Sequence, residues 1–512
     1  MKANKLTALI IMDGFGIPKD LNRSAIINAN TTHLRALADK YPSVAIGASE
    51  EYVGLPSGQA GTSEVGHLTI GTGRVVLQPL SRIDKEIRTG EFYKNKVLLD
   101  AMENAKIEGR SLHLVGLPSD GGIHSHINHL LALIKMAKEN NVENVYIHFI
   151  TDGRDTPPKS AAAYIKQVED CIKEVGVGKI ATVMGRFYAL DRDKNWDRVH
   201  EAYKALVNGD GVPAESATQA VEAAYKRNET DEFILPSVVL EDGKPTGVIK
   251  TGDSVISYNF RADRERQLAY VFDPDNTLDY TDKSLQTYFV CMMEYDETLK
   301  NCYVAYPKEE TKNMLCEVLS DRGYKQIKLA ETEKFAHLTF FFNNGKLDAF
   351  NDEFRTLINS EKMKSYAGNP KMGAYDITEK ALEAIKSDAY DVMMINFANC
   401  DMVGHSGVME AAMEAVEVVD ECVSKVTKEI LSKGGRVIII ADHGNADIMK
   451  YEDGSPHTAH TTNLVPCIIA DDDLIGVELR KGGSLADIAP TMLDLLNEEI
   501  PSEMEGKSLL IN

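Results

Sequence analysis

The chain has 512 residues, 43% hydrophobic and 26% charged, so it can bury a large core and is not expected to be disordered. Its 56 basic and 78 acidic side chains give a net charge of −22, which disfavours roles at nucleic acids or anionic membrane surfaces. The longest apolar runs, at residues 6–12 and 437–441, are far shorter than the ~20 residues that cross a bilayer.

Short β-rich apolar runs alternate with helical stretches along the chain. In chain order, strands are expected at residues 7–12, 112–117, 145–150, 180–184, 255–260, 391–397 and 436–441. Helices are expected at residues 127–138, 160–174, 377–385 and 409–431. This alternation predicts an α/β fold with mainly parallel sheets. In such sheets, ligand sites lie in the loops after the carboxyl ends of the strands.

Acidic residues and histidines follow three of the expected strands. Asp13 follows the first strand, Asp401 follows the strand that ends near Phe397, and Asp442-His443 follows the strand at 436–441. These positions are distant in sequence but can meet at one sheet edge. The full candidate set is Asp13, Asp401, His405, Asp442, His443, His457 and His460.

Carboxylate and imidazole ligands without thiolates fit Mn²⁺, Zn²⁺ or Mg²⁺. The set is large enough for two ions, and two neighbouring ions are typical of sites that displace a phosphoryl group. Any one of these motifs could equally be a helix cap or a solvated loop. The whole set together favours a metal centre.

Ser63 lies in the segment Gln59-Ala-Gly-Thr-Ser-Glu-Val-Gly-His67. This is not the G-x-S-x-G pattern of a triad hydrolase. Two interpretations stay open: a serine nucleophile activated by a metal, or a serine N-cap with Glu64 in the first helical turn. Both can hold, because a helix N-terminus also stabilises a phosphate.

Basic residues gather after strands in the middle of this acidic chain. Five arginines follow three expected strands, and a histidine-containing loop follows another; the residues are Arg154, Arg186, Arg192, Arg261, Arg264, His124 and His126. Arginine holds carboxylate and phosphate groups bidentately, so the set predicts a pocket for a small, multiply charged anion. Surface salt bridges with the many acids are the alternative. Lys334, taken alone, predicts only a solvated turn.

The distribution of these motifs predicts two domains. The metal-type residues lie near both ends of the chain and the arginines lie in the middle. We therefore expect a discontinuous metal-binding domain of residues 1–77 plus 309–512, with residues 78–308 inserted as the substrate-binding domain. Seven widely spaced cysteines without a C-x-x-C pattern predict free thiols in a reducing compartment, the cytoplasm.

Several longer motifs together are highly specific. They are Met12-Asp-Gly-Phe-Gly16, Thr62-Ser-Glu-Val-Gly-His67, Ser119-Asp-Gly-Gly-Ile-His-Ser-His126, Thr151-Asp-Gly-Arg-Asp-Thr156, Gly185-Arg-Phe-Tyr188, Asp191-Arg-Asp193, Asn259-Phe-Arg261, Glu331-Thr-Glu-Lys334, Asn399-Cys-Asp-Met-Val-Gly-His405, Asp442-His-Gly-Asn445 and His457-Thr-Ala-His460. In these motifs the chain resembles the cofactor-independent (2,3-bisphosphoglycerate-independent) phosphoglycerate mutases of the alkaline phosphatase superfamily. Thr62 and Ala262 replace the Asn and Pro common in that family.

The resemblance implies an alkaline-phosphatase-like parallel-sheet core with a second α/β domain inserted. It implies one metal site formed by Asp401, His405 and His460 and another formed by Asp13, Ser63, Asp442 and His443, with Mn²⁺ as the favoured ion. It also implies that Ser63 becomes phosphorylated. The positions that match substrate contacts in the family are His124, Arg154, Asp155, Arg186, Arg192, Arg261, Arg264 and Lys334.

The implied activity is the glycolytic and gluconeogenic interconversion of 3-phosphoglycerate and 2-phosphoglycerate. Ser63, Asp155 and Lys334 are the expected catalytic residues, and closure of the two domains, hinged near residues 78 and 308, would keep water from phosphoserine. A metal-dependent phosphatase or a phosphopentomutase on the same core is the alternative. The expected partner is a small phosphoglycerate, with no nucleic acid, no membrane and a monomer as the default.

Overall fold

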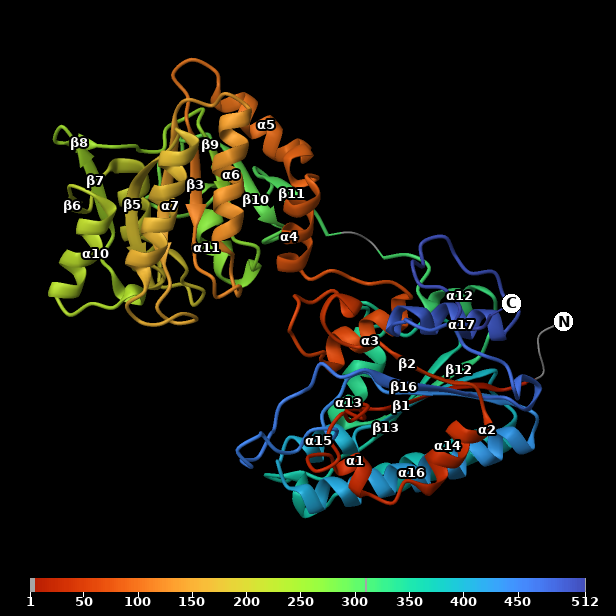
Figure 1. Ribbon diagram of the computed structural model, residues 1–512. Coiled ribbons are helices and arrows are strands. Elements are labelled where there is room, and N and C mark those ends of the chain that lie inside the picture. Colours follow the sequence, from red (N-terminus) through yellow and green to blue (C-terminus); the bar gives the residue numbers. More distant parts are fainter. Residues whose placement is uncertain (1–4, 309–310, 512) are drawn as a thin grey trace. The chain divides into compact units, whose positions relative to one another are not determined.

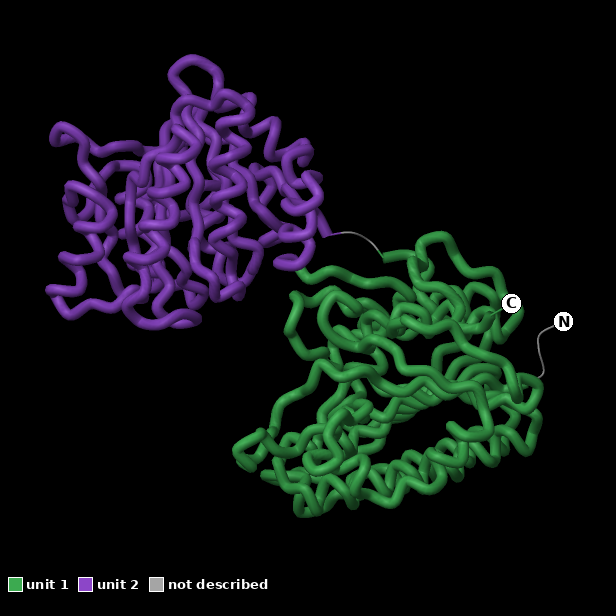
Figure 2. The backbone as a smooth tube through the Cα atoms, in the orientation of Figure 1, with its two compact units in different colours: residues 1–78, 310–512 green, residues 79–309 purple. Residues whose placement is uncertain are grey.

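The computed structural model describes residues 5–308 and 311–511. The chain divides into two compact units, residues 1–78 with 310–512 (unit 1) and residues 79–309 (unit 2), as Figure 2 shows. Each border lies one residue beyond the expected position. Each unit is built on a sheet of its own, so the α/β prediction is confirmed for both.

The sheet of unit 1 has seven strands in the order β13-β12-β14-β1-β15-β16-β2 (Figure 1). Its strands are β1 (Thr7–Met12), β2 (Ser43–Ile46), β12 (Gln326–Glu331), β13 (Glu353–Ile358), β14 (Val392–Phe397), β15 (Arg436–Ile440) and β16 (Val465–Ala470). The first five in this order are parallel, and β16 is antiparallel to both of its neighbours. Because β1 lies between β14 and β15, the carboxyl ends of these three strands are side by side.

Helices cover both faces of this sheet, which explains why every residue of β1 is buried and apolar or small. The helices are α1 (Ala25–Asn28), α2 (Thr32–Lys40), α3 (Ser63–Thr72), α12 (Leu315–Asp321), α13 (Thr332–Ala336), α14 (Ala374–Ser387), α15 (Asn399–Gly404), α16 (Met409–Ser432) and α17 (Ile488–Leu495). In Figure 1, α14 and α16 run along one face, and α3, α12 and α17 lie on the other. The long helix α16 buries Ala412, Ala415, Val416, Val419 and Val423, which share one helical face.

Unit 2 has nine strands, eight of them in the order β11-β10-β9-β3-β4-β5-β7-β6, with β8 paired to β7. They are β3 (Leu112–Gly116), β4 (Val145–Thr151), β5 (Lys179–Gly185), β6 (Val212–Ala214), β7 (Ser237–Glu241), β8 (Lys244–Pro245), β9 (Ser254–Ser257), β10 (Tyr288–Met293) and β11 (Tyr303–Tyr306). The run from β11 to β5 is parallel. Ligand-binding loops are therefore expected at one edge of this sheet as well.

Two separate hydrophobic clusters cover the two faces of the unit 2 sheet. The helices are α4 (Pro79–Thr89), α5 (Lys96–Ala105), α6 (Ile127–Glu139), α7 (Ala161–Val175), α8 (Arg186–Ala189), α9 (Trp196–Tyr203), α10 (Ala217–Lys226) and α11 (Ala262–Phe272). The first cluster takes its helical side chains from α4 to α7 and α10, and the second from α8, α9 and α11. Within the described residues of both units, no helix is long and apolar enough to cross a membrane.

The strand expected at residues 255–260 is wrong at its end, because β9 stops at Ser257. The backbone N–H of Tyr258 still donates to Val115 O. At the next residue, however, the side chain of Asn259 accepts the hydrogen bond from the Leu117 N–H, at 2.9 Å. The chain therefore leaves the sheet at Asn259 and turns into α11, which carries Arg264.

Candidate active site

Three acidic residues of unit 1 meet at the ends of neighbouring strands. Asp13 directly follows β1, Asp401 lies in α15 just after β14, and Asp442 lies two residues after β15. All three are almost fully buried. Gly14 has φ of +77°, and a Cβ there would lie 2.7 Å from the Asp401 backbone, so only glycine allows β1 to pass this close to α15.

Ser63 is the first residue of α3, and the interpretation of Ser63 as the helix N-cap is wrong. Thr62 is the N-cap, and its hydroxyl accepts from the Val65 N–H at 3.4 Å. The Ser63 hydroxyl is therefore free for other contacts, 2.9 Å from His443 Nε2 and 3.3 Å from Asp13 Oδ1. A serine oxygen here also lies at the positive end of the helix dipole, where a phosphate is stabilised.

Lys334, on α13, is buried rather than in a solvated turn. Its ammonium donates hydrogen bonds of 2.6 Å to Asp13 Oδ1, Ser63 Oγ and Asp401 Oδ2, which uses all three of its N–H groups. Burial opposes the charged form, but these carboxylates raise the pKa of Lys334 above its usual range. The carboxylates thus keep a buried lysine charged, and the sequence around Lys334 does not reveal them.

Asp401, His405 and His460 present three acceptor atoms to one point. His405 Nδ1 lies 2.8 Å from Thr458 O, and His460 Nδ1 lies 2.8 Å from Gly61 O, so both Nδ1 atoms carry the proton in the neutral ring. Both Nε2 atoms then face Asp401 Oδ1, at 3.2 and 3.1 Å. Converging lone pairs of this kind, with Nδ1 held by a carbonyl, fit a divalent cation.

Two overlapping groups surround Ser63: Asp13 with Asp401 and His443, and Asp13 with His67 and Asp442. The potential ligand atoms within each group lie within 4.8 Å of one another. Burial alone would lower the pKa of His443, but the carboxylates of Asp442, Asp13 and Asp401 raise it to about 9. The three carboxylates outnumber the positive charges beside them, and the residues present fit a second divalent cation that would take the place of this proton.

In unit 2, Arg186 is the centre of a buried polar cluster. Its Nη1 donates to Asp152 Oδ1 at 2.7 Å and to Asp155 Oδ2 at 2.5 Å, and its Nη2 lies 2.7 Å from His124 Nε2. Burial and then the Arg186 charge lower the pKa of His124 to about 4, so His124 is neutral at pH 7. Neutral His124 can accept from Arg186 without adding positive charge.

The other arginines of the set surround this cluster. Arg192 and Arg261 both pair with Asp263, at 3.0 and 2.9 Å, and remain half exposed. Burial, followed by the charges of Arg186, Arg192 and Arg154, lowers the pKa of Arg264, so these guanidinium groups are close enough to repel one another. An anion would relieve that repulsion. Arg154, also exposed, pairs with Glu232 at 3.2 Å.

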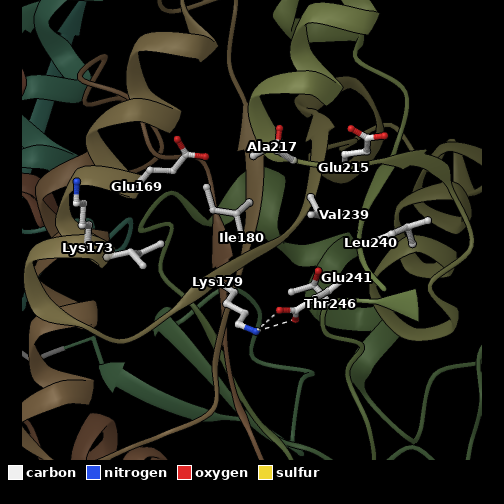
Figure 3. A pocket seen from close by; sticks show the side chains of 12 residues that line it. Glu169, Lys173, Lys179, Ile180, Glu215, Ala217, Val239, Leu240, Glu241 and Thr246 are labelled. Atoms are coloured by element: carbon white, nitrogen blue, oxygen red, sulfur yellow. Dashed lines mark hydrogen bonds and ion pairs between the residues drawn. The ribbon is translucent and has the colours of Figure 1, made fainter. Parts of the chain in front are cut away.

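Figure 3 shows a different pocket in unit 2, of about 350 Å³, between α7, β5, α10 and β7. Lys179 and Glu241 form an ion pair of 2.7 Å at this pocket. Lys179 begins β5, whereas the arginine cluster follows the carboxyl end of the same strand. The pocket is therefore on the opposite edge of the sheet from the candidate substrate residues.

Comparisons with known proteins agree along the whole chain. The family model for the N-terminus of BPG-independent PGAM matches residues 83–297, and that for type I phosphodiesterase / nucleotide pyrophosphatase matches residues 269–501. The 2,3-bisphosphoglycerate-independent phosphoglycerate mutase of Clostridium botulinum (strain Langeland) is 50% identical over 510 residues, covering 99% of this chain and 100% of the relative. The mutase of the same name from Clostridium beijerinckii is 50% identical over 511 residues, covering 100% of both.

This chain belongs to the 2,3-bisphosphoglycerate-independent phosphoglycerate mutase family. A solved structure agrees: Leishmania mexicana phosphoglycerate mutase, determined at low cobalt concentration, is 32% identical, with a TM-score of 0.57, and the match covers 100% of this chain and 98% of that one.

Some residues of this mutase site carry no role in the sequence analysis. Asp152 accepts from Arg186 and from the backbone N–H groups of Arg154 and Asp155, at 2.7 to 3.2 Å. Asn445 donates to Asp401 Oδ1 at 2.8 Å. Both stand inside quoted motifs, two positions from a residue with an assigned role, and that proximity in sequence is the signal that could have revealed them.

Proposed function

We propose that this chain interconverts 3-phosphoglycerate and 2-phosphoglycerate without 2,3-bisphosphoglycerate, in glycolysis and gluconeogenesis, through a phosphoserine at residue 63. One observation carries the proposal. The Ser63 hydroxyl lies at a helix N-terminus, 2.6 Å from the Lys334 ammonium and 2.9 Å from His443, amid two sets of metal-type ligands. The names of the full-length relatives support the same activity.

The residues of unit 1 would perform the phosphoryl transfer. Two divalent ions, Mn²⁺ in our proposal, held by Asp401, His405 and His460 and by Asp13, Ser63, Asp442 and His443, would favour the Ser63 alkoxide and offset phosphoryl charge. Ser63 Oγ attacks phosphorus, and the bond from phosphorus to the glycerate oxygen breaks. Lys334, already within hydrogen-bond distance of Ser63 Oγ, is placed to neutralise a phosphoryl oxygen.

The residues of unit 2 would hold the glycerate and move its protons. The arginines supply positive charge for a substrate of charge about −3, in line with their clustering. The Arg186 guanidinium helps hold the pKa of Asp155 below its usual value, although burial opposes this, so Asp155 is ionised at pH 7. Ionised Asp155 can take the proton of the attacking hydroxyl and return it to the oxygen that leaves.

The mutase differs from a phosphatase only in what attacks phosphoserine. Glycerate must stay bound, reorient and attack with its second hydroxyl before water does. The metal-dependent phosphatase and the phosphopentomutase are disfavoured by relatives that match the whole chain under the mutase name. Isomerisation and phosphate release, measured together on 3-phosphoglycerate and on a pentose phosphate, separate the three activities.

The test of the covalent route is Ser63→Ala. We expect it to abolish isomerisation and the transfer of ³²P from labelled 3-phosphoglycerate to the protein, while Mn²⁺ still binds through Asp401, His405 and His460. Full mutase activity in this variant would refute the phosphoserine mechanism.

The cellular setting of this activity is also a proposal. All seven cysteines lie in the described residues and carry free thiols, which supports a reducing compartment such as the cytoplasm. A monomer that acts on a small phosphoglycerate remains our default.

A further inference from the structure

His67 and Asn396 are two buried polar residues that the mechanism above does not use. His67 lies one turn after Ser63 on α3, and Asn396 lies inside β14, where its Cα pairs with that of Ile11 in β1. Neither side chain is exposed at all. A buried amide within the apolar segment Val392–Phe397 carries a desolvation cost unless its hydrogen bonds are made.

The hydrogen bonds of Asn396 fix the orientation of its amide. Its Nδ2 lies 2.9 Å from Asp13 Oδ2 and 3.0 Å from His67 Nε2. An ionised carboxylate can only accept, so the NH₂ group must face Asp13. One of its two hydrogens goes to Asp13 and the other to His67.

This orientation in turn fixes the tautomer of His67. Nε2 accepts from Asn396, so Nδ1 carries the proton in the neutral ring. That proton is donated to Ser63 O, 2.8 Å from Nδ1, and Asp442 Oδ2 lies 3.2 Å from the same nitrogen. Because Nε2 is occupied, His67 does not offer it to a metal, although His67 lies within a candidate ligand group with Asp13 and Asp442.

We propose that His67 and Asn396 are a positioning pair that holds Asp13 and Asp442 in the geometry needed to bind the divalent ion at Ser63. Asn396 occupies Asp13 Oδ2, and the other oxygen, Oδ1, is the one that faces Ser63 and Lys334. His67 Nδ1 donates to the Ser63 carbonyl and places its N–H 3.2 Å from Asp442 Oδ2, a favourable electrostatic contact. The pair thus connects helix α3, which carries Ser63, to both carboxylates. This inference rests on the proposed function.

The test measures Mn²⁺ affinity on the metal-free full-length protein, by calorimetric titration. His67→Gln loses the Nδ1 donor, and Asn396→Leu loses both amide donors; we expect each to weaken Mn²⁺ binding at this site about 10- to 100-fold. His67→Asn keeps an amide N–H near the Nδ1 position and should lose much less. Since both residues act through one network, the double variant should bind about as weakly as the weaker single variant.

The matched control is His129→Gln, which changes another buried helical histidine paired with an aspartate, Asp84 at 3.0 Å, in unit 2. It should leave Mn²⁺ affinity unchanged. In mutase assays, His67→Gln should regain activity when Mn²⁺ is raised, with an unchanged KM for 3-phosphoglycerate, which a general folding defect would not produce.

Three results are decisive. Wild-type affinity in both His67→Gln and Asn396→Leu, or an equal loss in His129→Gln, would overturn the positioning role. If the wild-type protein itself bound no divalent ion, the proposed function would fail instead, and the two failures are therefore distinguishable.

Discussion

Lys334→Met is the change that most directly tests the electrostatics of the site. Methionine keeps the length of the side chain and removes the ammonium that donates to Asp13, Ser63 and Asp401. Removing one partner of a buried ion pair costs about 3–5 kcal/mol. At about 2–4 °C per kcal/mol for a unit of this size, the melting temperature of the metal-free protein should fall by about 6–20 °C.

Mn²⁺ should restore more stability to Lys334→Met than it adds to the wild type. A saturating ligand at 100 times its Kd adds about 2.7 kcal/mol to the wild type. In Lys334→Met the carboxylates have lost the lysine ammonium. At an effective dielectric constant of about 20, the interaction between two unit charges 4 Å apart is about 4 kcal/mol. Mn²⁺ should therefore bind to the variant at least ~10-fold more tightly than to the wild type. Activity should nevertheless fall about 10²- to 10³-fold, because the phosphoryl oxygens lose a charged partner.

The matched control is Lys328→Met. Lys328 is the other fully buried lysine of unit 1 within the described residues, 3.3 Å from Glu353 and 2.8 Å from Asn343, and it contacts none of the candidate ligands. It should destabilise the protein by a similar amount without changing the Mn²⁺ dependence of the melting temperature. The measurement is thermal unfolding of the wild type, Lys334→Met and Lys328→Met, each with and without Mn²⁺. An unchanged melting temperature in metal-free Lys334→Met, or equal Mn²⁺ stabilisation in all three, would show that the reasoning is wrong.

Three further outcomes are expected. Asp442 and its neighbours raise the pKa of His443 to about 9, so Mn²⁺ must displace a proton from His443 below that pH. The affinity of the protein for Mn²⁺ should therefore rise by roughly tenfold per pH unit from pH 7 to 9. A calorimetric Mn²⁺ affinity that does not change with pH would contradict this. Asp155→Asn should reduce isomerisation by about 10²- to 10⁴-fold yet still allow ³²P transfer to Ser63, and equal loss of both would remove its proposed proton-transfer role. Burial raises the pKa of Glu265 from 4.5 to about 7, so the folded state holds this proton more tightly than the unfolded state does, and wild-type stability falls as pH rises from 4.5 to 7. Glu265→Gln should therefore gain about 2–3 kcal/mol relative to wild type between pH 5 and pH 8 in denaturant unfolding. No gain would contradict the raised pKa of Glu265.

Local sequence patterns predicted several of the central strands and helices and the edge of the sheet at which the metal-type residues lie. The strand expected at residues 7–12 and the helix expected at residues 409–431 depend only on neighbours in sequence, and both formed as expected. The order of strands was not available from sequence. It is the order β14-β1-β15 that brings Asp401, Asp13 and Asp442 together.

The local sequence around Lys334 and Asn396 gives no sign of their site contacts, and the physical reason is the same for both. Lys334 reads as a solvated turn because the carboxylates that neutralise it are 67 or more positions away in the chain. Asn396 reads as an ordinary strand residue because its two acceptors, Asp13 and His67, come from another strand and from a helix.

The sequence alone determined the α/β architecture, the family and the residue types available for chemistry, since these follow from periodicity and from motifs of adjacent residues. The tertiary structure alone decided which cation neutralises which carboxylate, which histidine nitrogen carries its proton, and which hydroxyl is left free at the start of α3. Charges and hydrogen bonds of this kind act over a few ångströms between segments that are hundreds of residues apart, and only the packing of strands and helices sets those distances.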